Sequence, residues 1–248
     1  MDSLIQFFNG FSFEALDRLL FWGSPYPLYF ILNCICICFI LRKSIRKCRP
    51  GVSYIFGFSL VFVGKIALSL LFPIPNPIFK HPEVVLYFTI VWFSMNAFPY
   101  DLVFKILSWI PFSFIVQLIF TMLQVREVFT VTRVVYVNKM QEYMIVPIVL
   151  ITVAAPQIIW MVCRLPKARW MGLISIIRLV FLSINQIALL FFGMNPMDQT
   201  NKSETMIRFS GLAISFIITF LTFVAYGKDH VDEFDVSLIV HIFRFLRK

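Results

Sequence analysis

The sequence of 248 residues is poor in charged residues and in histidine. Only 14% of the residues are Asp, Glu, Lys or Arg, three are histidine, and 60% are hydrophobic. Because soluble domains are about half apolar and about a quarter charged, this composition excludes an ordinary globular protein. The five cysteines show no disulfide or metal-binding framework, and no Ser-His-Asp or metal-ligand cluster is visible. We therefore predict no enzyme activity, no metal and no small-molecule cofactor.

The amino-terminal region does not have the pattern expected of a cleavable signal peptide. No basic stretch precedes a short apolar core, and Asp2, Glu14, Asp17 and Arg18 interrupt residues 1–22. We expect residues 1–22 to form a lumenal segment before the first membrane helix.

Long apolar runs predict an all-α membrane protein, because barrel strands would alternate at period two over about ten residues. We expect one membrane domain over residues 23–227 with seven transmembrane helices, and a short cytosolic tail over residues 228–248. A helix needs about twenty residues to cross the hydrocarbon, so the shorter runs would borrow flanking residues. The predicted spans are 26–41, 53–72, 84–99, 112–137, 144–163, 171–194 and 209–226.

The basic residues predict the orientation. Five lie in the connector 42–49 and three in the connector 164–169, whereas the alternate connectors hold fewer. By the positive-inside rule the amino terminus is lumenal and the carboxyl terminus cytosolic. The sequon at Asn201 then lies on the non-cytosolic side as a glycosylation candidate. The basic cytosolic connectors account for the net charge of +9. These connectors could also contact anionic lipid headgroups. Nothing in the sequence indicates nucleic-acid binding.

The seven predicted spans divide into two groups of three and a single last span. A tandem unit with an odd number of spans must insert inverted, so we predict a 3+3 inverted repeat plus a seventh helix. Gly64 and Lys65 lie in the second run, and Ala154, Ala155 and Pro156 lie in the corresponding fifth run. Small residues allow close helix approach, and Pro156 removes a backbone hydrogen bond and favours a kink. These five are candidate pore or gating residues.

Charges inside predicted spans are expensive, at about 2.5 kcal/mol or more each near the bilayer centre. They are Lys65, Arg126, Glu127, Arg133 and Arg178, of which Glu127 and Arg178 are further pore or gating candidates. Lys65 and Arg178 lie within about two turns of a span end, so we expect both to snorkel toward the membrane surface. Arg126 is too deep in its span for that.

The fourth run carries two polar stripes. Arg126, Thr130 and Arg133 share one helical face, and Gln117, Thr121 and Gln124 share the opposite face. Such a helix is unsuited to a broad lipid-facing position. We predict that it is central, with one stripe toward a water-filled path, and that an anionic lipid headgroup balances its arginines.

Residues 81–111 resemble the trimeric intracellular cation channel family. The matching residues are Trp92, Phe93, Pro99, Asp101, Leu102, Lys105 and Pro111. Arg126-Glu127-Val128 is similar to the Lys-Glu-Val motif of that family, and Pro50, Gly51, Lys167 and Trp170 also match. The resemblance implies a homotrimer in the endoplasmic or sarcoplasmic reticulum or the nuclear membrane. It further implies a potassium pore in each subunit that offsets the charge moved by calcium release, and a phosphoinositide near Arg126, Thr130 and Arg133.

The chain departs from that family at its glycines. Val63-Gly64-Lys65 stands where the family has a glycine triplet, and Val153-Ala154-Ala155 replaces a glycine-rich stretch. Added side chains straighten a helix and add bulk, and Lys65 places a cation where a cation channel has none. The sequence therefore predicts altered conductance.

Two other functional classes fit seven helices. A small-solute transporter of 3+1+3 plan is suggested by Pro156-Gln157, but the first half has no second Pro-Gln pair in the corresponding place. A seven-helix receptor is the other class, although the chain lacks its Asp-Arg-Tyr and Asn-Pro-x-x-Tyr motifs.

Overall fold

The computed structural model describes residues 27–44, 50–162, 168–192, 196 and 202–227, and these residues form helices and connectors without any strand. The all-α prediction is confirmed for this part of the chain. The predicted lumenal segment, the tail, Asn201 and Lys167 lie outside the described residues, as does the side chain of Trp170.

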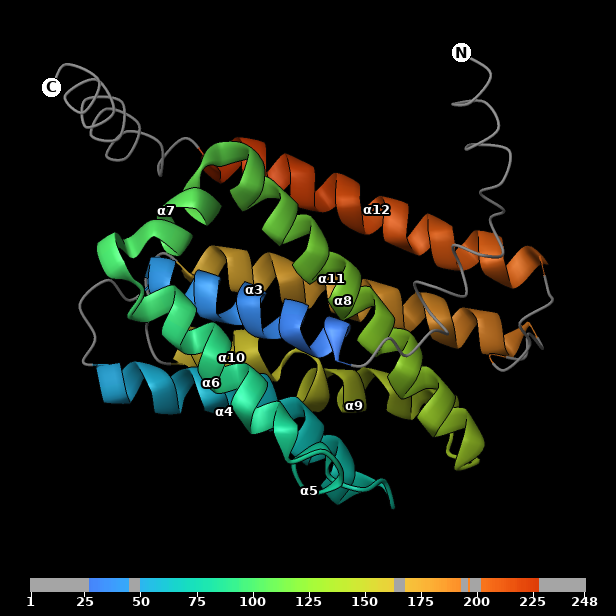
Figure 1. Ribbon diagram of the computed structural model, residues 1–248. Helices are drawn as coiled ribbons and strands as arrows, with labels where there is room; N and C mark the ends of the chain where they lie inside the picture. Colours follow the sequence, from blue (N-terminus) through green and yellow to red (C-terminus); the bar gives the residue numbers. More distant parts are fainter. Residues whose placement is uncertain (1–26, 45–49, 163–167, 193–195, 197–201, 228–248) are drawn as a thin grey trace, which may run out of the picture.

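Each predicted span corresponds to helical structure (Figure 1). The long helices are α3 (Leu28–Ser44), α4 (Pro50–Leu71), α6 (Glu83–Asn96), α8 (Ile110–Val137), α11 (Ala168–Phe191) and α12 (Lys202–Gly227). The fifth predicted span is two shorter helices, α9 (Ile145–Thr152) and α10 (Ala155–Val162). Short helices occupy connectors: α5 (Pro77–Lys80), η2 (Pro99–Asp101), α7 (Leu102–Ser108) and η3 (Glu142–Met144).

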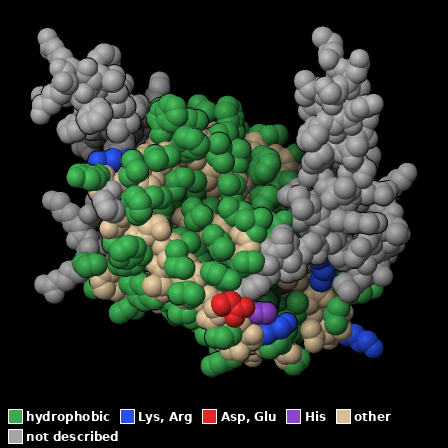
Figure 2. Space-filling model, viewed as in Figure 1, with side chains coloured by type: hydrophobic (Ala, Val, Ile, Leu, Met, Phe, Trp, Pro, Cys, Tyr) green, Lys and Arg blue, Asp and Glu red, His purple; other side chains and the backbone are tan. Residues whose placement is uncertain are grey.

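The helices have the apolar surface that a bilayer requires. Among the described residues, three helices are long and apolar enough to cross a membrane: Pro50–Leu71, Ile110–Val137 and Leu173–Phe191. Shorter apolar helices cover Glu83–Asn96, Glu142–Thr152 and Arg208–Val224. In Figure 2 apolar side chains cover much of the visible face, and the few charged ones lie near its edges.

The long helix α8 is central, as its two polar stripes predict. It packs against α3, α7, α9, α11 and α12, and it runs diagonally across the bundle in Figure 1. In a second set of contacts, α4 packs against both α9 and α10. The middle helices of the two predicted halves therefore lie against each other.

The break between α9 and α10 follows from Pro156. A proline has no N–H, so the carbonyl of Thr152 loses its helical donor, and Pro156 itself fits the first turn of α10. The N–H groups of Val153 and Ala154 both donate to the carbonyl oxygen of Val149, at 2.8 and 3.0 Å. This shared acceptor ends α9 and confirms the predicted kink.

Gly64 brings α4 into contact with the broken helix. A Cβ atom at this position would collide with the carbonyl oxygen and carbon of Thr152. Only a residue without a side chain permits this backbone approach. The prediction that small residues join the second and fifth spans is therefore confirmed at Gly64.

The connector between α6 and α8, which contains Lys105, is itself largely helical. Tyr100 and Asp101 both have a φ of 58°, which turns the chain sharply between η2 and α7. The Asp101 carboxylate lies 2.6 Å from the guanidinium of Arg42, at the end of α3. Lys105 lies within α7, and Pro111 lies in the first turn of α8, where its missing N–H is harmless.

Replacing Gly64 with alanine tests the helix contact. In an open helix Gly→Ala stabilises by about 1 kcal/mol. At Gly64 we expect the opposite, a loss of about 1–3 kcal/mol in the free energy of unfolding, because the new methyl group overlaps backbone that cannot rotate away. Thermal unfolding in detergent measures the change.

Gly51→Ala is the matched control, since nothing lies within 4 Å of a Cβ atom there and Gly51 belongs to the same helix. Equal stabilisation by the two substitutions would contradict the close contact of α4 with α9.

Candidate functional site

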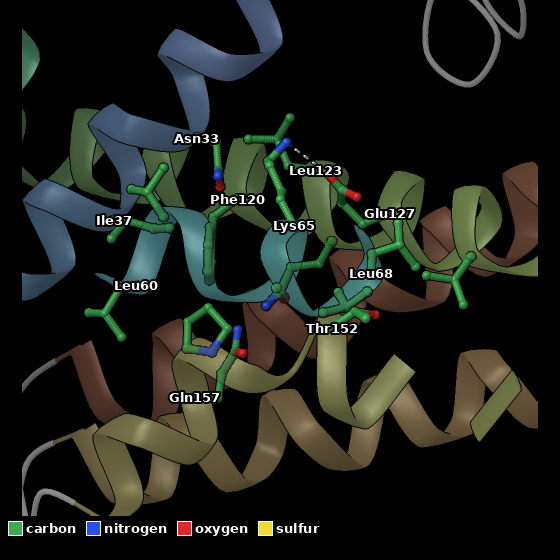
Figure 3. Close-up of a pocket in the computed structure, with 16 residues that line it drawn as sticks. Asn33, Ile37, Leu60, Lys65, Leu68, Phe120, Leu123, Glu127, Thr152 and Gln157 are labelled. Atoms are coloured by element: carbon green, nitrogen blue, oxygen red, sulfur yellow. Dashed lines mark ion pairs between the residues drawn. The ribbon is translucent and has the colours of Figure 1, made fainter. Parts of the chain in front are cut away.

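A cavity of about 70 Å³ lies where the broken helix meets α3, α4 and α8 (Figure 3). This volume holds a few water molecules. Its wall is mostly apolar, but besides Thr152 five residues with polar side chains line it: Asn33, Lys65, Gln124, Glu127 and Gln157. Gly64, Thr152, Val153 and Pro156 complete the wall at the helix break. Of the candidate pore residues of the second and fifth spans, Gly64, Lys65 and Pro156 therefore meet at one cavity, whereas Ala154 and Ala155 are buried outside its wall.

Lys65 and Glu127 form an ion pair across this cavity. The ammonium nitrogen of Lys65 lies 3.5 Å from Glu127 Oε1, and the side chains point toward each other from α4 and α8 in Figure 3. The Lys65 ammonium also lies 5.8 Å from the ring centroid of Phe30, within reach of a cation–π interaction. The Lys65 side chain is 31% exposed and paired with Glu127, so its predicted reach toward the membrane surface stays a prediction.

The Gln157 side chain forms hydrogen bonds with the backbone at the helix break. When its amide oxygen faces Gln124, the amide nitrogen donates to the carbonyl oxygens of Val153 and Ala154, at 3.2 and 3.0 Å. The oxygen then accepts a hydrogen bond from Gln124 Nε2. Backbone carbonyls inside hydrocarbon need such partners, so one buried side chain both supports the break and joins it to α8.

Arg178 is buried between three helices and does not snorkel, contrary to expectation. Only 6% of its surface is exposed. Its Nη1 donates to the hydroxyl oxygens of Thr121 on α8 and Thr219 on α12, at 2.9 and 2.8 Å. Its Nη2 donates to Gln124 Oε1 and, at 3.3 Å, to Ser175 Oγ. All of these acceptors are neutral.

These contacts form one polar network through the bundle. It begins at Thr219 on α12, passes through Arg178 and Gln124, and ends at Gln157 beside the helix break. Thr121 and Gln124 belong to one predicted stripe of α8, so helical spacing could have found them. Thr219 gave no comparable signal, because it is one of several Ser and Thr residues in its run, and Gln157 stood out only as the neighbour of Pro156.

The three predicted lipid-binding residues of α8 have different surroundings. The guanidinium carbon of Arg126 lies 3.8 Å from the ring centroid of Tyr29 on α3. Thr130 donates to the backbone oxygen of Arg126 at 3.0 Å. Arg133 lines a cavity of about 20 Å³ together with Gln186 and Arg208, a volume suited to about one water molecule rather than a headgroup.

The motif residues near α6 have structural contacts. The indole N–H of Trp92 lies 3.4 Å from Ser53 Oγ on α4, and its ring packs edge-on against Tyr54 with centroids 5.3 Å apart. Asp101 forms its ion pair with Arg42, whose guanidinium carbon also lies 4.5 Å from the ring centroid of Phe104. Pro99 begins η2. These residues join α6 and α7 to α3 and α4, away from the cavity.

The architecture is that of an all-helical membrane protein with a polar interior at a broken helix. No family model matches the sequence, and no curated protein matches it either. Two solved structures share the fold, and both are trimeric intracellular cation channels from C. elegans. The structure determined in the absence of Ca²⁺ matches with a TM-score of 0.62 and 14% identity, over 86% of this chain and 96% of that chain. The structure with bound Ca²⁺ matches with a TM-score of 0.57 and 12% identity, over 84% and 95%. The chain therefore has the trimeric intracellular cation channel fold, as the resemblance near Trp92 and Asp101 predicts.

Replacing Thr219 with valine tests the anchoring of Arg178. The substitution removes one neutral acceptor from a buried guanidinium, so we expect the free energy of unfolding to fall by about 1.5–3 kcal/mol. Chemical or thermal unfolding of the purified protein in detergent measures it.

Thr222→Val provides the control on the same helix. Both threonines donate to the carbonyl oxygen four residues earlier, but only Thr219 also accepts from Arg178. Similar losses for the two variants would contradict a specific role for the Arg178 contact.

Proposed function

We propose that this protein is a monovalent cation channel that carries potassium across an intracellular membrane. The shared fold over 86% of the chain, together with a polar cavity at the broken helix, is the observation that carries the proposal. The protein would act as a homotrimer with one pore in each subunit. It would supply counter-ion flow during calcium release in the endoplasmic or sarcoplasmic reticulum or the nuclear membrane.

The proposed path runs between the two halves of an inverted repeat. The packing supports this plan, because α3 packs on α4 and α6 in the first half, while α11 packs on α8, α9 and α10 in the second. The halves meet through α3 with α8 and through α4 with the broken helix. Sites at such a repeat interface, beside an interrupted helix, are typical of membrane transport proteins.

The basic connectors support the proposed orientation. Residues 42–49 and 164–169 carry more Lys and Arg than the alternate connectors, which favours a lumenal amino terminus and a cytosolic carboxyl terminus.

The ion pair between Lys65 and Glu127 would set the conductance. The pair spans the cavity from α4 to α8. Ions would therefore pass either beside the pair or between the two side chains when they separate. Glu127 is the one carboxylate among the described residues lining the cavity, and a bare carboxylate would attract a cation there. Lys65 pairs with that carboxylate and would thereby reduce the flow of potassium.

Charge removal at each partner should change the current in opposite directions. In planar bilayers containing the purified protein, Lys65→Gly frees Glu127 and raises the potassium conductance roughly tenfold, whereas Glu127→Gln leaves Lys65 unbalanced and abolishes it. Ser69→Ala serves as the control, because Ser69 bonds only to the Lys65 backbone of its own helix. A potassium current that Lys65→Gly leaves unchanged would contradict the role of this pair.

An anionic lipid is proposed as the further ligand of α8. Arg126 and Arg133 lie seven residues apart on one helix face. The described cavities are too small for a headgroup, so a phosphoinositide would bind along the outside of α8 against Tyr29 and Arg126.

Neutralising both arginines tests lipid binding. The double substitution Arg126→Gln and Arg133→Gln should lower phosphoinositide retention during purification severalfold, since each arginine near a lipid surface contributes about 1 kcal/mol. Native mass spectrometry measures the bound lipid. The control is Lys139→Gln, just beyond the carboxyl end of the same helix. Unchanged retention in the double variant would refute this site.

A further inference from the structure

Two arginines from different helices line one small cavity near an end of the helix bundle. The cavity has a volume of about 20 Å³, and its polar lining consists of Arg133 on α8, Gln186 on α11 and Arg208 on α12. Gln186 and Arg208 are only 5% and 4% exposed. Each of these three helices packs against the other two, so the cavity lies where they meet.

This cavity is separate from the one at the broken helix. Among the described residues, the two cavities have no lining residue in common. Arg133 and Gln186 lie near the carboxyl ends of their helices, and Arg208 lies near the amino end of α12. In the proposed orientation all three of these helix ends are lumenal. The cavity therefore lies outside the proposed path for cations.

The polar groups around the cavity suit an anion. A guanidinium group has only N–H donors and keeps its proton, and the Gln186 amide can present its nitrogen as a further donor. Among the described residues that line the cavity, none is acidic. Two positive charges beside one space of low dielectric constant repel each other, and both attract an anion placed between them. A water molecule in the same place would balance neither charge.

The volume limits that anion to a single atom. One water-sized probe occupies about 10–15 Å³, so the cavity has room for a halide but not for sulfate or phosphate. Apolar side chains form the rest of its lining: Phe129, Leu189, Leu190 and Pro196.

We propose that a chloride ion binds in this cavity and holds α8, α11 and α12 together. The inference goes beyond the proposed function, because the chloride stays bound outside the path and does not cross the membrane. It is therefore compatible with a pore that conducts cations.

Chloride titration of the purified full-length protein in detergent tests the site, with gluconate replacing chloride at constant ionic strength. Bound chloride should broaden the chlorine NMR signal. It should also raise Tm by about 3–5 °C at a concentration of about ten times its Kd, because a ligand of the folded state stabilises that state. Bromide should replace chloride, whereas sulfate and inorganic phosphate should not.

Two substitutions remove donors from the cavity. We expect Arg208→Gln to weaken chloride binding about tenfold or more, because it removes a charged donor, and Gln186→Leu to weaken it about fivefold. Gln186→Leu also decides the question if Arg208→Gln does not fold, which gel filtration reveals. Arg133 stays unchanged in this experiment, because it belongs to the proposed lipid site.

The matched control is Lys139→Gln. It removes one positive charge just beyond the same end of α8, at a residue that does not line the cavity. This variant should keep the wild-type affinity for chloride.

Three results would overturn the chloride site. They are a folded wild type that responds equally to chloride and gluconate, a wild type that responds as strongly to sulfate as to chloride, and an unchanged chloride affinity in Gln186→Leu. None of these measurements depends on ion current, so the chloride site and the proposed channel function can fail separately.

Discussion

A helix that breaks inside a hydrocarbon layer must find partners for the carbonyl groups it frees, and this requirement shapes the interior of the protein. Pro156 has no N–H to donate to the Thr152 carbonyl, and two other residues adapt the structure to the break in different ways. Gln157 supplies amide hydrogens to the carbonyls of Val153 and Ala154. Gly64 places bare backbone against Thr152, so α4 can approach the break. Because lipid offers no hydrogen bonds, the Gln157 amide replaces what water would provide in a soluble protein, whereas the Gly64 contact lets α4 pack closely against the break.

The polar interior follows from that first requirement. Gln157 must itself be oriented, and its oxygen finds the amide of Gln124 on α8. The other end of the Gln124 amide then accepts from Arg178, which draws in hydroxyl groups from α8 and α12. A buried network of this kind is stabilising only when nearly every member is satisfied. Removing Thr219 or Gln124 therefore affects the break in α9–α10 through contacts that lie on other helices.

The sequence predicts the fold well because its dominant signal is the length and spacing of apolar runs. The centrality of α8 also follows from the sequence, since two polar stripes on one helix exclude a broad lipid face. Side-chain partners are harder to predict. Nothing in the local pattern pairs Lys65 with Glu127, 62 positions later, and proximity to a span end wrongly suggests that Arg178 snorkels. Partner choice depends on which helices pack together, and helical periodicity carries no information about that.

The cations Lys65 and Arg178 are stabilised in different ways. Lys65 has an acidic partner, Glu127, so its charge largely cancels at a distance. Arg178 has only dipolar partners, which hold the guanidinium in place and leave its field in the interior. A guanidinium group is suited to this position because its planar fork reaches several acceptors at once and it does not lose its proton. Lys65 and Arg178 thus show two ways of holding a cation between membrane helices, one through a carboxylate that neutralises the charge and the other through several neutral acceptors.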